Sequence, residues 1–139
     1  MKMVLARIGT NPTVQYAFDE LVRCFGQMDE SLLMDRRVYE ERNASAEGIL
    51  WIGLDGSVPY ATDDEICIDI RKGAGIITGS NERSVLIAVY RVLYEMGCRF
   101  IRPGKDGEIL CKQSIAKETL NIQIHEKASY RHRSVCIVT

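Results

Sequence analysis

The glycine-rich stretch from Gly73 to Ser80 leads into a helical pattern, so a phosphate-binding loop must be considered first. A dinucleotide-binding loop needs glycine where Thr78 stands, and a P-loop needs Lys followed by Ser or Thr where Asn81 and Glu82 stand. Glu82 would also place negative charge at the helix N-terminus, where a phosphate would have to bind. We therefore predict turn glycines around a strand, and no nucleotide cofactor.

A second candidate is the pair His125-Glu126, which matches the start of the zinc-protease motif H-E-x-x-H. Ser129 occupies the position of the second histidine, and the segment has the alternating pattern of a strand. The chain has two histidines, too few for a zinc site with three histidine ligands. No metal site is predicted.

Acid–base catalysis requires two carboxylates that are held across a cleft with separated pKa values. Asp63, Asp64 and Glu65 are adjacent, and a solvated turn before a strand explains them. No serine lies in a nucleophile-elbow motif. Trp51 could stack on a sugar ring, but it lies within Ile-Leu-Trp-Ile and is predicted to be a core residue. The sequence thus predicts no catalytic residue.

Composition restricts the classes of partner. The net charge of -1 argues against a nucleic-acid surface, and no apolar run approaches the roughly 20 residues of a membrane span. Arg7 interrupts the first apolar run before a secretory signal can form, so we expect a cytoplasmic protein if Met1 is the native start. Buried, reduced thiols are expected for the five irregularly spaced cysteines: Cys24, Cys67, Cys98, Cys111 and Cys136.

The candidate residues above must be positioned by two amphipathic helices and a run of strands. The first helix is expected from Asn11 and Pro12, with Gly26 able to end it, and the second from a cap at Ser80 or Asn81 to Gly97. Strands are expected at residues 4–8, 36–41 (a short edge strand), 49–54, 65–70, 76–78, 98–101 and 120–125. This order predicts an α+β fold, a mixed sheet with both helices packed on one face.

The segment from Ile76 to Pro103 resembles part of a known domain. It is similar to the second half of the N-terminal domain of family 67 α-glucuronidases and of β-N-acetylhexosaminidase-type enzymes, in which a strand and a helix precede a catalytic barrel. The sequence differs from the usual pattern at Phe100, often Trp, and at Ala88, often Gly. The residues that carry the resemblance are Gly79, Tyr90, Leu93, Gly97, Arg99 and Pro103.

Two further segments fit the same resemblance. Residues 16–21 look like the first helix of such domains, and residues 129–134 look like the passage that leads into the first barrel strand. The resemblance implies an accessory domain at residues 1–128 and a lead-in to a missing catalytic barrel at residues 129–139. Arg131 or Arg133 would then contact substrate in the cleft of the parent enzyme; a surface or interdomain position is the alternative for both.

The resemblance thus implies a non-catalytic accessory domain of a glycoside hydrolase, whose partner is the C-terminal catalytic barrel of the same protein. It also implies an apolar patch, partly from residues 135–138, that is exposed or used for self-association when the barrel is absent. A self-contained ligand- or protein-binding module is the alternative. An independent small enzyme is a third possibility, which no motif supports.

Overall fold

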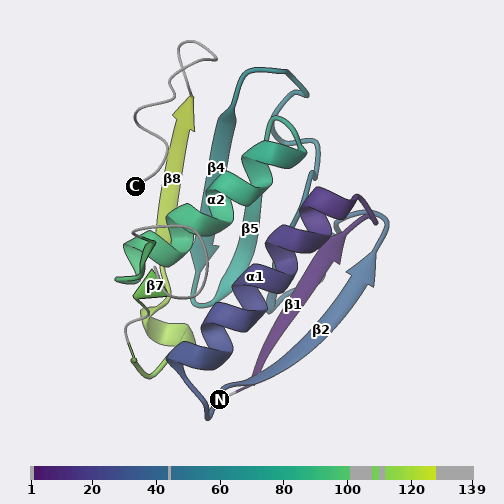
Figure 1. Cartoon of the computed structure of the whole chain (residues 1–139). Coiled ribbons are helices and arrows are strands. Elements are labelled where there is room, and N and C mark those ends of the chain that lie inside the picture. Colours follow the sequence, from purple (N-terminus) through teal and green to yellow (C-terminus); the bar gives the residue numbers. More distant parts are fainter. Residues whose placement is uncertain (1, 44, 101–107, 110–111, 128–139) are drawn as a thin grey trace.

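In a computed structural model, the chain forms a six-stranded mixed sheet with two helices against one face (Figure 1). The structure describes residues 2–43, 45–100, 108–109 and 112–127. The elements are β1 (Lys2–Ile8), α1 (Pro12–Met28), β2 (Leu33–Tyr39), β3 (Ile49–Ile52), β4 (Glu65–Arg71), β5 (Ala74–Gly79), α2 (Glu82–Glu95), β6 (Arg99–Phe100), β7 (Glu108–Ile109), the 3-10 helix η2 (Lys117–Thr119) and β8 (Ile122–Lys127). The predicted fold class is confirmed.

The strand order in the sheet is β2-β1-β3-β5-β4-β8. The first four strands in this order run parallel to one another, whereas β4 is antiparallel to both of its neighbours, β5 and β8. β4 and β5 are joined by the two-residue turn Lys72-Gly73, in which both residues have positive φ (53° and 75°). That conformation matches the twist of a hairpin and explains the glycine there.

The first helix begins as predicted but ends later. The Asn11 side chain accepts hydrogen bonds from the backbone N–H groups of Thr13 and Val14, at 2.8 and 3.3 Å. Gly26 was predicted to end the helix, which is wrong: α1 continues to Met28. The apolar stripe continues past Gly26, because both Phe25 and Met28 are buried, and tertiary packing therefore prolongs the helix.

The second helix starts at Asn81, whose side chain accepts from the backbone N–H of Ser84 at 2.9 Å. Ser80, the other predicted cap, is instead a buried residue whose hydroxyl donates to the carbonyl of Asp63 at 2.6 Å. Gly97 follows the helix with a φ of 103°, as its predicted role at the C-terminus requires.

The main core lies between the helices and one face of the sheet. Ile66, Ile68 and Ile70 alternate toward this core, as their spacing predicts. In Figure 1, α1 lies over β1 and α2 lies over β4 and β5. Cys24 and Cys98 are fully buried, as predicted, whereas Cys67 is half-buried. Cys111 and Cys136 lie outside the described residues.

A smaller apolar cluster covers the other face of the sheet around Trp51, which is 2% exposed. Tyr39 packs against it, with ring centroids 5.4 Å apart. Ala46 also packs on this cluster, so the connection from β2 to β3 crosses this face. The prediction that Trp51 is a core residue is confirmed.

Strand boundaries differ from the prediction where tertiary contacts decide them. β2 starts earlier than residue 36, because Leu33 and Met34 pair with Lys2 and Met3 of β1. β3 ends at Ile52, since Gly53 has a φ of 144° and a Cβ there would lie 2.8 Å from the Cβ of Ile8. β2 is an edge strand, as predicted.

Several predicted features lie outside the described residues: Arg131, Arg133, the lead-in at residues 129–139 and the apolar patch at residues 135–138. Within the described part of the chain, no helix is long and apolar enough to cross a membrane.

Candidate functional site

The parallel strands β1, β3 and β5 end on the same side of the sheet, which we call the carboxyl edge. Both helices begin there. Open sheets with parallel strands usually bind their ligands at this edge. A hollow of about 200 Å³ lies there, lined by the turn between β1 and α1, by the apolar side chains of Val14 and Leu54, and by Glu40 and Glu82. It is the best candidate for a ligand site among the described residues.

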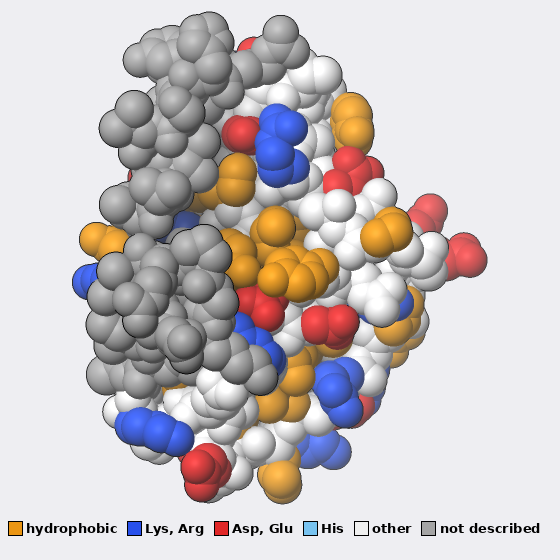
Figure 2. All heavy atoms as spheres, in the orientation of Figure 1, with side chains coloured by type: hydrophobic (Ala, Val, Ile, Leu, Met, Phe, Trp, Pro, Cys, Tyr) orange, Lys and Arg blue, Asp and Glu red, His pale blue; other side chains and the backbone are white. Residues whose placement is uncertain are grey.

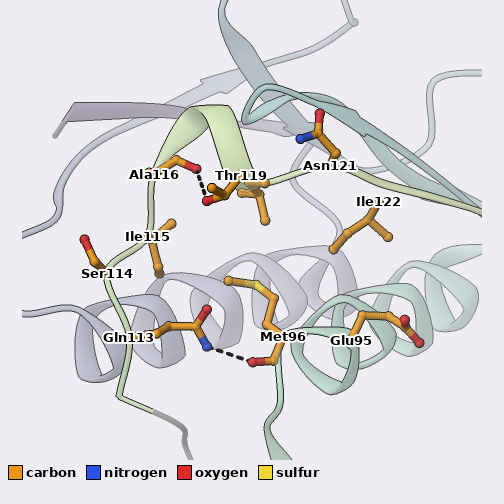
Figure 3. A pocket seen from close by; sticks show the side chains of 10 residues that line it. Glu95, Met96, Gln113, Ser114, Ile115, Ala116, Thr119, Asn121 and Ile122 are labelled. Carbon is orange, nitrogen blue, oxygen red and sulfur yellow. Dashed lines mark hydrogen bonds between the residues drawn. The ribbon is translucent and has the colours of Figure 1, made fainter.

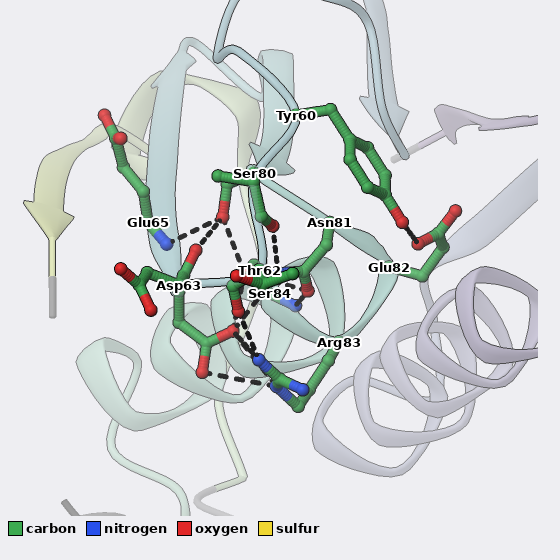
Figure 4. Close-up of polar contacts among 11 residues, drawn as sticks. Tyr60, Thr62, Asp63, Glu65, Ser80, Asn81, Glu82, Arg83 and Ser84 are labelled. Atoms are coloured by element: carbon green, nitrogen blue, oxygen red, sulfur yellow. Dashed lines mark hydrogen bonds and ion pairs between the residues drawn. The ribbon is translucent and has the colours of Figure 1, made fainter. Parts of the chain in front are cut away.

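An exposed tyrosine stands beside this hollow. The Tyr60 hydroxyl donates a hydrogen bond to the Glu82 carboxylate at 3.0 Å, and the Tyr60 side chain is 70% exposed (Figure 4). This hydrogen bond raises the pKa of Tyr60 above its ordinary value. An aromatic face beside carboxylate acceptors suits a ligand with several hydroxyl groups.

Phosphate binding is disfavoured at this edge. Glu82 is the first residue of α2, so its negative charge opposes an anion at the helix N-terminus. The backbone N–H of Ser84, one of the groups that would bind the anion, already donates a hydrogen bond to the Asn81 side chain.

A polar network lies next to the hollow and ties the loop before β4 to the start of α2 (Figure 4). The Asp64 carboxylate accepts hydrogen bonds from the Arg83 guanidinium at 2.9 and 3.0 Å and from the Ser84 hydroxyl at 3.0 Å. The Ser80 hydroxyl accepts from the backbone N–H of Glu65 at 3.0 Å. The expected solvated turn is therefore wrong for Asp64, whose partners lie about 20 residues away along the chain.

This network depends on a close approach of the backbone at Gly79. A Cβ at Gly79 would lie 2.5 Å from the Cβ of Ser84 and 2.8 Å from the carbonyl oxygen of Glu65. Only glycine lets β5 pass this close to α2 and β4. The network and the glycine thus fix the geometry of the loop that carries Tyr60.

A row of chemically active side chains crosses the face of the sheet opposite the helices. Cys67 lies opposite Thr78 of β5 on one side and opposite His125 of β8 on the other. The His125 ring nitrogen Nε2 lies 2.5 Å from the Glu65 carboxylate. Sequence reasoning missed this row, because the strand register brings the residues together.

The row lacks an activated nucleophile. Burial raises the pKa of the Cys67 thiol, and the carboxylates of Asp69, Asp55 and Glu65 raise it further. A reactive cysteine needs the opposite, a positive surrounding that stabilises the thiolate. In the described ranges, no group of three or more His, Cys, Asp and Glu side chains could hold a metal ion.

A second hollow, of about 230 Å³, lies between the end of α2 and the segment before β8 (Figure 3). The Gln113 amide donates to the carbonyl of Met96 at 2.7 Å, and the Thr119 hydroxyl donates to that of Ala116 at 3.0 Å. These side chains satisfy backbone groups within the chain. The described residues that line the hollow therefore offer little for catalysis.

Among the described residues, the charge distribution on the face that carries the helices gives no sign of a nucleic-acid surface. In Figure 2, Lys and Arg side chains alternate with Asp and Glu side chains over this face. A nucleic-acid site would gather positive charge into a patch or stripe.

The described residues of the Ile76–Pro103 resemblance have structural roles. Leu93 is fully buried, and Gly97 ends α2. The Tyr90 hydroxyl donates to the Glu20 carboxylate of α1 at 3.0 Å, which connects the two helices. Arg99 stacks its guanidinium 4.1 Å above the ring centroid of Tyr94.

No protein-family model matches the chain, and no curated protein matches it either.

Proposed function

We propose that the chain is a non-catalytic accessory domain of a glycoside hydrolase and that it supports the catalytic barrel of the parent enzyme. The observation that carries this proposal is that the described residues of the Ile76–Pro103 resemblance shape and pack the fold. Gly79, Leu93 and Gly97 shape and pack the unit formed by β5 and α2, and Tyr90 joins α2 to α1. Side chains that serve packing are what a supporting domain needs.

The sheet also offers a suitable connection to a barrel. β8 is an edge strand and ends at Lys127, four residues before Arg131 and six before Arg133. In the proposal the chain continues from this edge strand into the barrel, which would therefore lie beside β8.

The first test is enzymatic. The purified chain should not turn over aryl hexosaminides or aryl glucuronides, whereas a longer product of the same reading frame should cleave one of them. A reading frame that stops at Thr139, or turnover by the 139-residue chain itself, would refute the proposal.

The second test addresses the supporting role in the longer product. Gly79→Val should lower the temperature at which activity is lost and leave kcat below that temperature unchanged, because it disrupts the packing of β5 against α2. Lys72→Ala, on the exposed turn between β4 and β5, is the matched control and should change neither quantity. If Gly79→Val left the inactivation temperature unchanged, the supporting role would be wrong.

The hollow at the carboxyl edge favours the alternative, a self-contained ligand-binding module. Its carboxylates and the exposed Tyr60 ring would bind a polyhydroxylated ligand such as an oligosaccharide. Titration with neutral oligosaccharides, followed by the NMR signals of the hollow, separates the two functions. Saturable binding that Tyr60→Ala abolishes and Tyr16→Ala retains would favour the module; Tyr16 is also exposed but lies on α1.

A further inference from the structure

The edge strand β2 exposes apolar side chains together with an unpaired backbone edge. Among the described strands it has one neighbour, β1. Leu33 is 65% exposed, Val38 52% and Tyr39 40%. Edge strands that stay alone are usually short, charged, bulged or interrupted by proline, because their free N–H and C=O groups can pair with another chain. β2 has seven residues and no proline, and its charged residues Asp35, Arg36 and Arg37 are of both signs.

Symmetry limits the ways in which two copies of β2 can pair. A two-fold axis perpendicular to the sheet makes the strands antiparallel and keeps the helices of both copies on the same side. Residues that lie directly opposite each other in an antiparallel pair point to the same face of the sheet. The two-fold axis must therefore pass at one residue, which lies opposite its own copy, and cannot pass between two consecutive residues. With the axis at Arg36, all of Leu33–Tyr39 pairs; with the axis at Asp35 or Arg37, the strand ends overhang.

The side chains favour the register with Arg36 on the axis. Asp35 then lies opposite Arg37 of the other copy, and this ion pair occurs twice by symmetry. Each of the two neighbouring registers likewise places one charged residue, Asp35 or Arg37, opposite its own copy, but neither forms the Asp35–Arg37 ion pairs.

The apolar residues of the strand match in the same register. Leu33 lies opposite Tyr39 of the other copy, and Met34 lies opposite Val38. The one like-charged contact is Arg36 with its copy, and Arg36 is exposed, so both guanidinium groups can turn into water.

We propose that the chain forms a two-fold symmetric homodimer in which β2 pairs antiparallel with β2 of a second copy, centred on Arg36. The dimer joins the two six-stranded sheets edge to edge. β8 lies at the opposite edge of each sheet, so this pairing leaves the connection to a barrel free. The proposal is independent of the proposed function.

A charge-reversal experiment tests the pairing. Asp35 and Arg37 form an ion pair within one chain, with Nη2 and Oδ2 2.8 Å apart, and each would contact the second copy as well. Asp35→Lys and Arg37→Glu each turn both symmetric pairs from attraction into repulsion. Each should weaken dimerisation at least about tenfold in sedimentation equilibrium.

The decisive sample is an equimolar mixture of these two variants. In a mixed dimer each new side chain faces an opposite charge, so the mixture should dimerise at concentrations at which either variant alone is mostly monomeric. Instability of the single variants cannot produce that result. A wild-type chain that stays monomeric, or single variants that dimerise as well as the wild type, would overturn the proposal; the second result would place the interface on another surface.

Disulfide trapping tests the register. In the proposed dimer the two Arg36 Cα atoms lie about 5 Å apart, within reach of a disulfide, whereas the two Arg37 Cα atoms lie about 8 Å apart. Arg36→Cys should cross-link under mild oxidation, and Arg37→Cys should cross-link no more than the wild type. The reverse pattern would contradict this register.

Discussion

The two helix caps provide a quantitative test of how burial changes the energy of one kind of hydrogen bond. Asn11 and Asn81 perform the same local task, since each accepts from backbone N–H groups of the first helical turn. Their surroundings differ. Asn11 is exposed, whereas Asn81 is 7% exposed and its amide also donates to the carbonyl of Ala61 at 2.8 Å. The perturbation is replacement of each by alanine.

The expected magnitudes follow from these contacts. In Asn11→Ala water can reach the freed N–H groups, so the free energy of unfolding should fall by about 0.5–1 kcal/mol. In Asn81→Ala the buried N–H of Ser84 and the carbonyl of Ala61 both lose a partner. An unsatisfied buried polar group costs about 1–3 kcal/mol, so a total loss of about 2–3 kcal/mol is expected.

Urea unfolding measures both losses. Trp51 is the single tryptophan and is buried, so its fluorescence reports the loss of the folded state. With a slope of about 2 kcal/mol/M, the midpoint should fall by about 1–1.5 M in Asn81→Ala and by about 0.25–0.5 M in Asn11→Ala. Equal shifts in the two variants would refute the reasoning, because burial would then make no difference to the cap.

Three further predictions address other parts of the fold. Gly75→Ala should destabilise the protein by about 3 kcal/mol or more in the same urea assay, because the φ of Gly75 is 142° and a Cβ there would lie 1.9 Å from a carbonyl oxygen of β4. Gly26→Ala, inside α1, should instead stabilise the protein by about 0.5–1 kcal/mol. A loss of stability in Gly26→Ala would contradict the observed helix end. Burial raises the pKa of Asp55, but hydrogen bonds from a serine and an arginine outweigh it and hold the pKa below 3.8. The stability that this carboxylate contributes is therefore present above the unfolded pKa and lost as the pH falls through the lower folded value. The difference in unfolding free energy between the wild type and Asp55→Asn should shrink from about pH 5 to about pH 2, and a constant difference would contradict it. Alkylation followed by peptide mass spectrometry should modify Cys67 more slowly than free cysteine, because its pKa is raised, and faster than the fully buried Cys24; the opposite order would be inconsistent with the sheet register.

Local signals in the sequence determined much of the secondary structure. The spacing of apolar residues identified both helices and the buried faces of β4 and β8. Asn11 and Gly97 marked helix ends correctly, because a cap and a left-handed residue act within a few positions of the chain. Gly26 was misread as a helix end because glycine also tolerates helical backbone, and packing of Met28 decided the outcome.

The tertiary structure alone decided which elements are neighbours. Periodicity reports which side of a strand is buried, but it carries no information about the strand beside it. The row of Thr78, Cys67 and His125 depends on the registers of β4 with β5 and β8. The Asp64 network likewise joins residues that only the packing of α2 against β4 brings within hydrogen-bonding distance.

The edge strand β2 also separates what the sequence determines from what the tertiary structure decides. The three charged residues of Leu33–Tyr39, with two apolar residues on each side of them, are visible in the sequence, and their symmetry about Arg36 is a property of the sequence alone. That symmetry gains a physical meaning because the fold places β2 at an edge, with its outer backbone groups unpaired by any described strand. In a central strand the same residues would pair with neighbouring strands on both sides, and the pattern would carry no information about a second copy of the chain.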